Sequence, residues 1–254
     1  MTSITDASFC QETVIENGVE KRHRSQKAVI NCLVSPDILK TDDADIHIIN
    51  WQSVTVTDKK ACNSTLQAEA HAMISGTDLG DKFRAIINSM RGKLDLFEWE
   101  NSTNRNPMRH LWLSDCSSLV SHLKNPIETK LENTRLSIDM AALRQRLWAD
   151  HNGEPYEELP EDDKANNIVR WIDTSVMIAD CLTKRMKATN LWPAMRGKLS
   201  LTPTPESILT KMRKQKARKK TKEPDPEDGV LIKEEEADET PFDGLHDEIW
   251  MSYQ

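Results

Sequence analysis

Polar and apolar residues alternate in three short runs near the start of the chain. The runs cover Ser3–Phe9, Gln26–Ser35 and Asp45–Val56, are rich in β-branched residues, and are separated by polar, turn-like segments. β-branched side chains favour extended backbone, and alternation places one side of a strand against a core. The pattern therefore predicts three consecutive strands, most simply an antiparallel meander.

The next periodic segment has helical rather than strand spacing. Ser64 followed by Gln67 matches a capping box, and apolar residues then recur every three or four positions for more than twenty residues. Gly76 and Gly80 lie inside this pattern and lower its helix propensity. We therefore expect a long helix with a kink, or a break into two helices, near these glycines.

Strands and helices alternate after a polar, Asn-rich loop at residues 100–107. The pattern predicts, in order, a strand at Met108–Ser114, helices at Ser117–Leu123 and Thr134–Trp148, a strand at Asn167–Ile172 and a helix at about Val176–Lys187. A meander followed by alternating strands and helices is typical of an α/β architecture. We therefore expect a five-stranded mixed sheet flanked by helices.

Charge divides the chain near residue 200. Residues 201–254 contain 9 Lys and Arg against 13 Asp and Glu, with eight basic residues and no acid in Lys211–Lys222 and an acidic run at Glu223–Glu239. Such blocks repel themselves and bury little, so we predict a domain at residues 1–200 and a largely disordered tail at residues 201–254. The basic block is compatible with a nuclear-import signal, a nonspecific nucleic-acid clamp or a solvated helix face.

The composition argues against several classes of protein. The 254 residues contain no apolar run of the roughly 20 residues that a membrane span needs, and residues 1–9 lack the basic and apolar regions of a signal peptide. The five cysteines form no CxxC pair and no zinc-type cluster, so we expect reduced thiols rather than disulfides or a structural zinc site. We expect an intracellular protein, cytoplasmic or nuclear, with no membrane partner.

Four acidic residues lie in contexts where a lone carboxylate is costly. They are Asp6, Glu69, Asp115 and Asp180, placed in predicted strands, at a strand end or on a predicted helix. A carboxylate in an apolar setting needs a cation or hydrogen-bond donors to offset its desolvation. A divalent metal ion is the candidate that the pattern favours. Asp45 and Asp58 are rivals to Asp6 for the first position.

Three of these acids also have a purely structural interpretation. Asp115 would suit the N-cap of the helix that follows it. Glu69 would suit a solvated residue in the first turns of its helix, where the helix dipole favours an acid. Asp180 would suit an ordinary i,i+4 pair with Lys184. The sequence leaves both interpretations open at each position.

The local contexts of the four acids follow a recognisable order. The first strand carries Thr5-Asp6-Ala7, and the long helix opens with Ser64-Thr65-Leu66-Gln67-Ala68-Glu69. The fourth strand ends in Asp115-Cys116-Ser117-Ser118, its following helix ends in Lys124-Asn125-Pro126, and the last helix carries Ala179-Asp180-Cys181-Leu182-Thr183-Lys184. In this order, over residues 3–187, the motifs resemble the ribonuclease H domain of Ty1/copia-type retrotransposon polymerases.

The resemblance implies a ribonuclease H-like fold and a metal-dependent endonuclease that hydrolyses the RNA strand of RNA–DNA hybrids. It implies two Mg²⁺ or Mn²⁺ ions, with Asp6 bridging them, Glu69 and Asp115 on the ion at the leaving oxygen, and Asp180 on the ion that activates water. Two ions about 3.5–4 Å apart can stabilise both the attacking and the leaving oxygen of a phosphodiester. Such hard cations prefer carboxylate oxygens.

Residues that bind substrate are harder to recognise from the sequence. The basic candidates follow the third and fourth acids, and they are Lys124, Lys130, Arg135, Lys184, Arg185 and Lys187. Each is equally compatible with a solvated surface. Residues 1–200 have 25 Lys and Arg against 28 Asp and Glu, which argues against strong independent affinity for nucleic acid. In the family a neighbouring polymerase domain helps to hold the hybrid, and this chain, without a polymerase motif, resembles a fragment of such a polyprotein.

Two functions of different class follow from these patterns. The first is the metal-dependent endonuclease, and the second is a non-catalytic or domesticated remnant that keeps the fold for nucleic-acid or protein binding. The four acids favour the first, whereas the short first strand and the acidic body favour the second. The two hypotheses differ on whether the carboxyl groups meet in one cluster.

Overall fold

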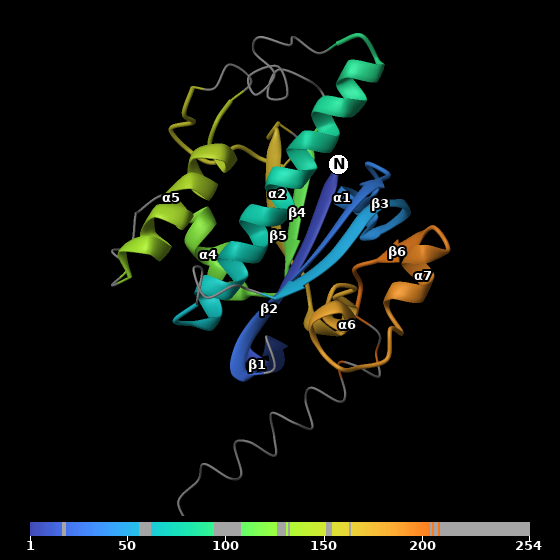
Figure 1. Ribbon diagram of the computed structural model, residues 1–254. Helices are drawn as coiled ribbons and strands as arrows, with labels where there is room; N and C mark the ends of the chain where they lie inside the picture. Colours follow the sequence, from blue (N-terminus) through green and yellow to red (C-terminus); the bar gives the residue numbers. More distant parts are fainter. Residues whose placement is uncertain are drawn as a thin grey trace, which may run out of the picture. The chain divides into compact units, whose positions relative to one another are not determined.

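A six-stranded mixed sheet forms the centre of the fold, with its strands in the order β5-β4-β1-β2-β3-β6 (Figure 1). The strands are β1 (Thr2–Glu16), β2 (Val19–Val34), β3 (Asp43–Thr55), β4 (His110–Ser114), β5 (Asn167–Trp171) and β6 (Lys198–Ser200). β1, β2 and β3 pair antiparallel in chain order, which confirms the predicted meander. β4 is parallel to β1, and β5 is parallel to β4.

The computed structural model describes most of the chain before residue 209. The described residues are 1–16, 19–55, 62–93, 108–125, 131, 133–150, 154–162, 164–203, 205 and 208. Contacts separate Met1–Ile208 from Leu209–Gln254, and the second of these units lies outside the described residues, so the tail stays a prediction. Within the described ranges, no helix is long and apolar enough to cross a membrane.

The prediction of five strands missed β6. This strand pairs antiparallel with Asp43–Asp45 at the start of β3, and its three residues are too few for a periodic pattern to show. β1 and β2 are also longer than predicted, because they continue beyond Phe9 and before Gln26 as paired strands. The sequence of that extension is largely polar and does not alternate, which explains the underestimate.

α2 (Thr65–Met90) is one continuous helix of 26 residues, so the expected break at its glycines is wrong. Its start is as predicted, since Gln67 N donates to Ser64 Oγ. The glycines instead allow close packing on the sheet. A Cβ on Gly76 would lie 2.5 Å from Thr5 Cγ2, and a Cβ on Gly80 would collide with the His110 ring. α2 therefore lies close to both β1 and β4.

The predicted helix at Val176–Lys187 is confirmed only over Asp180–Thr183. The other helices are α1 (Ile38–Thr41), α4 (Ser117–Lys124), α5 (Thr134–Leu147), the 3-10 turn η2 (Thr174–Val176), α6 (Asp180–Thr183) and α7 (Leu191–Met195). Met177, Ile178 and Ala179, which precede α6, are all buried. The chain enters α6 through this buried, non-helical segment, which apolar spacing alone does not distinguish from a helix.

Helices and loops cover both faces of the sheet. On one face Trp112 and Val169 belong to a core formed with α2, α4 and α5, which lie on the same side of the sheet in Figure 1. On the other face Leu111 and Leu113 belong to a second core that includes Leu191 of α7. Neighbouring residues of β4 thus enter different cores, as expected for a strand buried on both faces.

Candidate metal centre

Asp6 and Asp115 come together because their strands are parallel neighbours. Ile4 of β1 is opposite Leu113 of β4, and the two strands are parallel. Two positions further along each strand, Asp6 and Asp115 therefore lie at the same end of this strand pair. Asp6 also pairs with Ala28 of β2, which places it inside the sheet. Strand register alone therefore joins two acids that are more than a hundred residues apart in the sequence.

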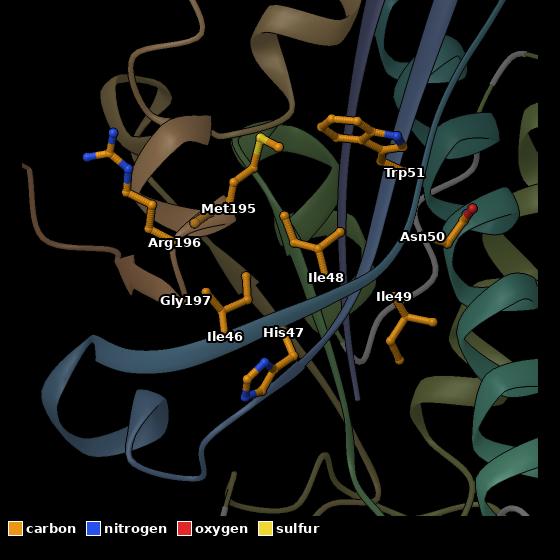
Figure 2. Close-up of a pocket in the computed structure, with 10 residues that line it drawn as sticks. Ile46, His47, Ile48, Ile49, Asn50, Trp51, Met195, Arg196 and Gly197 are labelled. Carbon is orange, nitrogen blue, oxygen red and sulfur yellow. The ribbon is translucent and has the colours of Figure 1, made fainter.

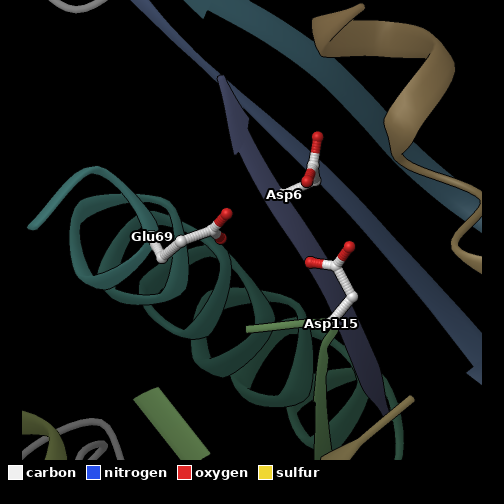
Figure 3. A group of neighbouring side chains, drawn as sticks. All are labelled: Asp6, Glu69 and Asp115. Atoms are coloured by element: carbon white, nitrogen blue, oxygen red, sulfur yellow. The ribbon is translucent and has the colours of Figure 1, made fainter. Parts of the chain in front are cut away.

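Glu69 joins these two acids from the second turn of α2. Ala7 N donates to Glu69 Oε1 at 3.3 Å, which ties the helix to β1 beside Asp6. Ligand oxygens of Asp6, Glu69 and Asp115 all lie within 4.8 Å of one another, and Figure 3 shows them converging from a strand, a helix and a strand end. Glu69 is only 4% exposed, so its interpretation as a solvated residue is wrong.

The acidic cluster of Asp6, Glu69 and Asp115 has more negative charge than its neighbours satisfy. Asp6 is 1% exposed, and neither Asp6 Oδ1 nor Glu69 Oε2 accepts a hydrogen bond within the described part of the chain. Burying an unsatisfied carboxylate is costly, and a cation that the carboxylates coordinate removes that cost. Three convergent carboxylates are a donor set that fits a hard divalent ion such as Mg²⁺ or Mn²⁺.

Burial and crowding raise the pKa of each carboxyl group in the cluster. Burial, followed by the charges of Asp6 and Asp115, raises the pKa of Glu69 to about 9. Burial also raises the pKa of Asp6, although a hydrogen bond from Thr183 and the charge of Lys184 oppose it. For Asp115, burial and then the charge of Asp6 raise the pKa. The cation-free cluster therefore holds a proton at neutral pH, which cation binding would release.

Asp115 does not cap the helix that follows it. The N-cap of α4 is Cys116, without a side-chain capping hydrogen bond, and Cys116 N instead bonds to Ser114 Oγ at 3.1 Å. Trp171 Nε1 donates to the main-chain carbonyl of Asp115 at 2.9 Å, which fixes the backbone at this strand end. The Asp115 carboxylate is thus left to face Asp6 and Glu69 (Figure 3).

Asp180 lies beside the acidic cluster but outside the group of three. It is the first residue of α6 and is 5% exposed, and its Oδ1 accepts a hydrogen bond from Lys184 Nζ at 2.7 Å. Lys184 Nζ also lies 3.5 Å from Asp6 Oδ1. Although burial lowers the pKa of Lys184, the hydrogen bond to Asp180 and the charge of Asp6 raise it overall. The i,i+4 pair that the sequence offered as an alternative is therefore present.

Thr183 is a residue of this site that the sequence interpretation did not single out. Its Oγ1 donates to Asp6 Oδ2 and lies 3.2 Å from the carbonyl oxygen of Asp180, and Thr183 is 3% exposed. The available signal was its place in the motif that runs from Asp180 to Lys184. A buried hydroxyl in that position orients the Asp6 carboxylate.

The predicted nucleic-acid-binding residues that the structure describes lie on or beside different helices. Lys124 is exposed at the end of α4, Arg135 is exposed in the first turn of α5, and Lys184 lies at the acidic cluster. Lys130 lies outside the described residues. Of the rival acids, Asp45 is exposed and bonds to Lys198 at 2.5 Å, while Asp58 also lies outside the described residues.

A separate pocket of about 610 Å³ lies between β3 and α7 (Figure 2). Residues Ile46–Trp51 and Ala194–Gly197 line it, and none of the four predicted acids does. The pocket and the acidic cluster are therefore in different places. Convergent carboxylates, rather than the size of a hollow, identify the site.

Comparisons with known proteins add little to these observations. No family model matches the sequence, and no curated protein matches it significantly. Among solved structures, the chain is similar to the N-terminal RNase H domain of a Mycobacterium tuberculosis protein, solved as a fusion with maltose-binding protein. The two are 10% identical with a TM-score of 0.37, and the match covers 77% of this chain and 92% of that one.

Strand order and direction, rather than that weak match, define the class of this protein. An antiparallel meander is followed by two parallel strands, and acids from β1, α2 and the end of β4 meet at the sheet. This is the mixed sheet that the resemblance implied, with β6 added at one edge. The protein has a ribonuclease H-like fold.

Proposed function

We propose that this protein is a metal-dependent endonuclease that hydrolyses the RNA strand of RNA–DNA hybrids. The observation that carries the proposal is the convergence of Asp6, Glu69 and Asp115 in a largely buried cluster, in which Asp6 Oδ1 and Glu69 Oε2 accept no hydrogen bond among the described residues. Its origin in a Ty1/copia-type retrotransposon polyprotein is part of the proposal, and the order of the sequence motifs supports it.

The side chains of the cluster would hold Mg²⁺ or Mn²⁺. When bound, the cation supplies the positive charge that the transition state of phosphodiester hydrolysis requires. Asp6 is held inside the sheet and oriented by Thr183, and Glu69 is held through Ala7 N. Ligands fixed in this way need little reorganisation during the reaction, which is how an active site stabilises developing charge.

The choice of substrate rests on the resemblance and on the exposed basic residues. Lys124, Arg135, Arg185 and Lys187 are all exposed. A hybrid is recognised through its backbone and the 2′-hydroxyl groups of the RNA strand, for which basic and polar side chains are suited. Since residues 1–200 are net negative, a polymerase domain of the parent polyprotein would supply further phosphate contacts.

A cleavage assay with the full chain tests this function. In Mg²⁺ or Mn²⁺, we expect cleavage of the labelled RNA strand of a hybrid, and no cleavage of a DNA duplex or of single-stranded RNA. Asp115→Asn should lower the rate by more than the roughly 10–100-fold that loss of an outer-shell metal partner costs. Glu158→Gln, which changes an exposed acid outside the cluster, is the matched control and should keep full activity. An inactive parent, or full activity in Asp115→Asn, contradicts the proposal.

One observation favours a second candidate function. Lys184 already compensates part of the charge of Asp6 and Asp180, as expected of a module that keeps the fold without cleaving nucleic acid. Such a domesticated module would bind the hybrid equally well with and without a chelator. Fluorescence anisotropy in excess EDTA, together with the cleavage assay, separates the two functions.

A further inference from the structure

The ammonium group of Lys184 lies between two of the four carboxylates. Its Nζ is 2.7 Å from Asp180 Oδ1 and 3.5 Å from Asp6 Oδ1. A cation that bridged Asp6 and Asp180 would have to occupy this same position. In the described part of the chain, the place that the sequence resemblance allotted to a second metal ion therefore already holds a positive charge.

The surroundings hold Lys184 in place. Lys184 N donates to the carbonyl oxygen of Asp180 at 2.9 Å, and Ser53 Oγ of β3 donates to the carbonyl oxygen of Leu182 at 2.6 Å. Asp180 and Thr183, the first and last residues of α6, are buried, and the side chain of Lys184, which follows them, is one third exposed. α6 thus attaches the lysine to the sheet, unlike a freely solvated surface lysine.

The two candidate cation positions differ in what they lack. At Asp6, Glu69 and Asp115, the buried Glu69 Oε2 accepts no hydrogen bond within the described residues, so this position is open to a cation. At Asp6 and Asp180, the Lys184 ammonium already supplies both a hydrogen bond and a charge. Thr183 completes this second position by donating to the other oxygen of Asp6.

We propose that this centre binds one divalent ion, at Asp6, Glu69 and Asp115, and that Lys184, held by Asp180, provides its second positive charge. The inference rests on the proposed function and specifies its metal content. A divalent ion at the second position would lie within a few ångströms of the ammonium group, and that repulsion opposes its binding. Asp180 then acts as a positioning residue for Lys184, and Lys184 offers a charge-assisted donor to a phosphate oxygen.

Counting bound Mn²⁺ tests this inference without an activity assay. Titration of the full chain with Mn²⁺, followed by electron paramagnetic resonance, should give one bound ion for the parent protein. Lys184→Met leaves Asp6 and Asp180 without their cation, so this variant should bind two ions. Lys187→Met removes an exposed lysine nearby in the sequence and should still bind one.

A second variant keeps the test informative if Lys184→Met fails to fold. Asp180→Asn should still bind one ion, because Asp180 is not a metal ligand in the proposed arrangement, whereas a centre with two metal ions would lose one. Two ions in the parent, one in a folded Lys184→Met, or a lost ion in Asp180→Asn each overturns the inference. Two ions in the parent would leave the proposed nuclease function standing, while no bound ion in the parent would remove that function itself.

Discussion

The same three elements, β1, α2 and β4, bury polar groups at two places, and the two places differ in how those groups are satisfied. Around the first turns of α2 lies the acidic cluster of Asp6, Glu69 and Asp115. Further along the same helix lies a polar network made of Ser3, Asp81, Arg84 and His110. Both places are built from β1, α2 and the β4 region, so the difference between them is chemical.

In the polar network, groups of opposite charge are paired. His110 bonds to Ser3 Oγ at 2.7 Å and to Asp81 Oδ1 at 3.1 Å, and Arg84 donates to the same Asp81 oxygen at 2.9 Å. Asn31 Nδ2 donates to Ser3 Oγ at 2.7 Å. Positive and negative charges are present together, so the protein itself compensates the charges of the network, although Asn31 Oδ1 accepts no hydrogen bond within the described residues.

In the acidic cluster, charges of one sign meet and oxygens remain without donors. Burial raises the pKa of Asp81 as it does that of Glu69, yet the bonds from His110 and Arg84 bring the pKa of Asp81 down to about 2, whereas that of Glu69 reaches about 9. Buried charges that the protein does not compensate are therefore a better indication of a functional site than buried polar groups in general. The network has its compensating charge within the protein, whereas the cluster is the candidate site for a cation.

The largest expected effect comes from breaking the network. Arg84→Met removes the buried cation that keeps Asp81 paired, and Arg84 is only 1% exposed. Removing one partner of a buried ion pair costs about 3–5 kcal/mol of stability, which urea denaturation would show. Lys82→Met, at an exposed position of the same helix, is the control and should change stability little. A loss for Arg84→Met no larger than the control's would show that the network is not structural.

Glu69→Gln should have the opposite effect on the metal-free protein. The folded pKa of Glu69, about 9, lies above the unfolded value, so its contribution to stability is complete in acid and declines as the pH rises toward 9. At pH 7, the neutral amide of the variant avoids this loss and should raise the free energy of unfolding by about 3 kcal/mol. Thermal denaturation in EDTA measures the gain, and Mn²⁺ binding should be weakened in the same variant. An unchanged or lowered stability would contradict the description of the cluster.

The network should also make stability sensitive to acid. His110 is fully buried, and burial lowers its pKa to about 4 even though the bond to Asp81 opposes this. An unfolded histidine has a pKa near 6.5, so the unfolded chain binds a proton that the native state does not as the pH falls from about 6.5 to about 4. The native state should lose about 3 kcal/mol across this window. Asp81 stays ionised there, because its pKa is about 2.

This acid sensitivity is best measured as a difference, because Glu69 contributes to the pH dependence with the opposite sign. Denaturation of the parent and of His110→Asn at several pH values gives that difference. The variant should show a smaller loss of stability on acidification than the parent. Equal slopes in the two proteins would mean that His110 is not held neutral by burial.

The smallest change in stability is expected from a change in the packing of α2 against β4, which both the acidic cluster and the polar network depend on. Gly80→Ala places a methyl group against the His110 ring, and such overpacking typically costs about 1–3 kcal/mol. Ser89→Ala, at an exposed position near the end of α2, is a suitable control and should be close to neutral. A stabilised Gly80→Ala would imply that α2 can move away from β4 without loss. Circular dichroism melting curves give the comparison.

Much of this fold was predictable because its elements carry their own periodic patterns. The meander, the start of α2, β4 and β5 follow from alternation, capping and apolar spacing. β6 was missed because three residues carry no period, and the helix at 176–187 was predicted too long because apolar spacing does not distinguish the buried, non-helical residues Met177–Ala179 from a helix. The periodic pattern of a short segment does not predict structure that depends on its packing against distant parts of the chain.

The acids were visible in the sequence, but their partners were not. Local context singled out Asp6, Glu69, Asp115 and Asp180, because charged residues interrupt segments that otherwise read as buried. Only the parallel register of β1 with β4, and the close approach of α2 that Gly76 permits, brings three of them together. Only the helical turn of α6 brings the Lys184 ammonium group next to the carboxylate of Asp180, the fourth acid. The sequence by itself determined which residues carry charge into the core, and the tertiary structure decided which of those charges meet, because distances across a sheet depend on register and packing rather than on separation along the chain.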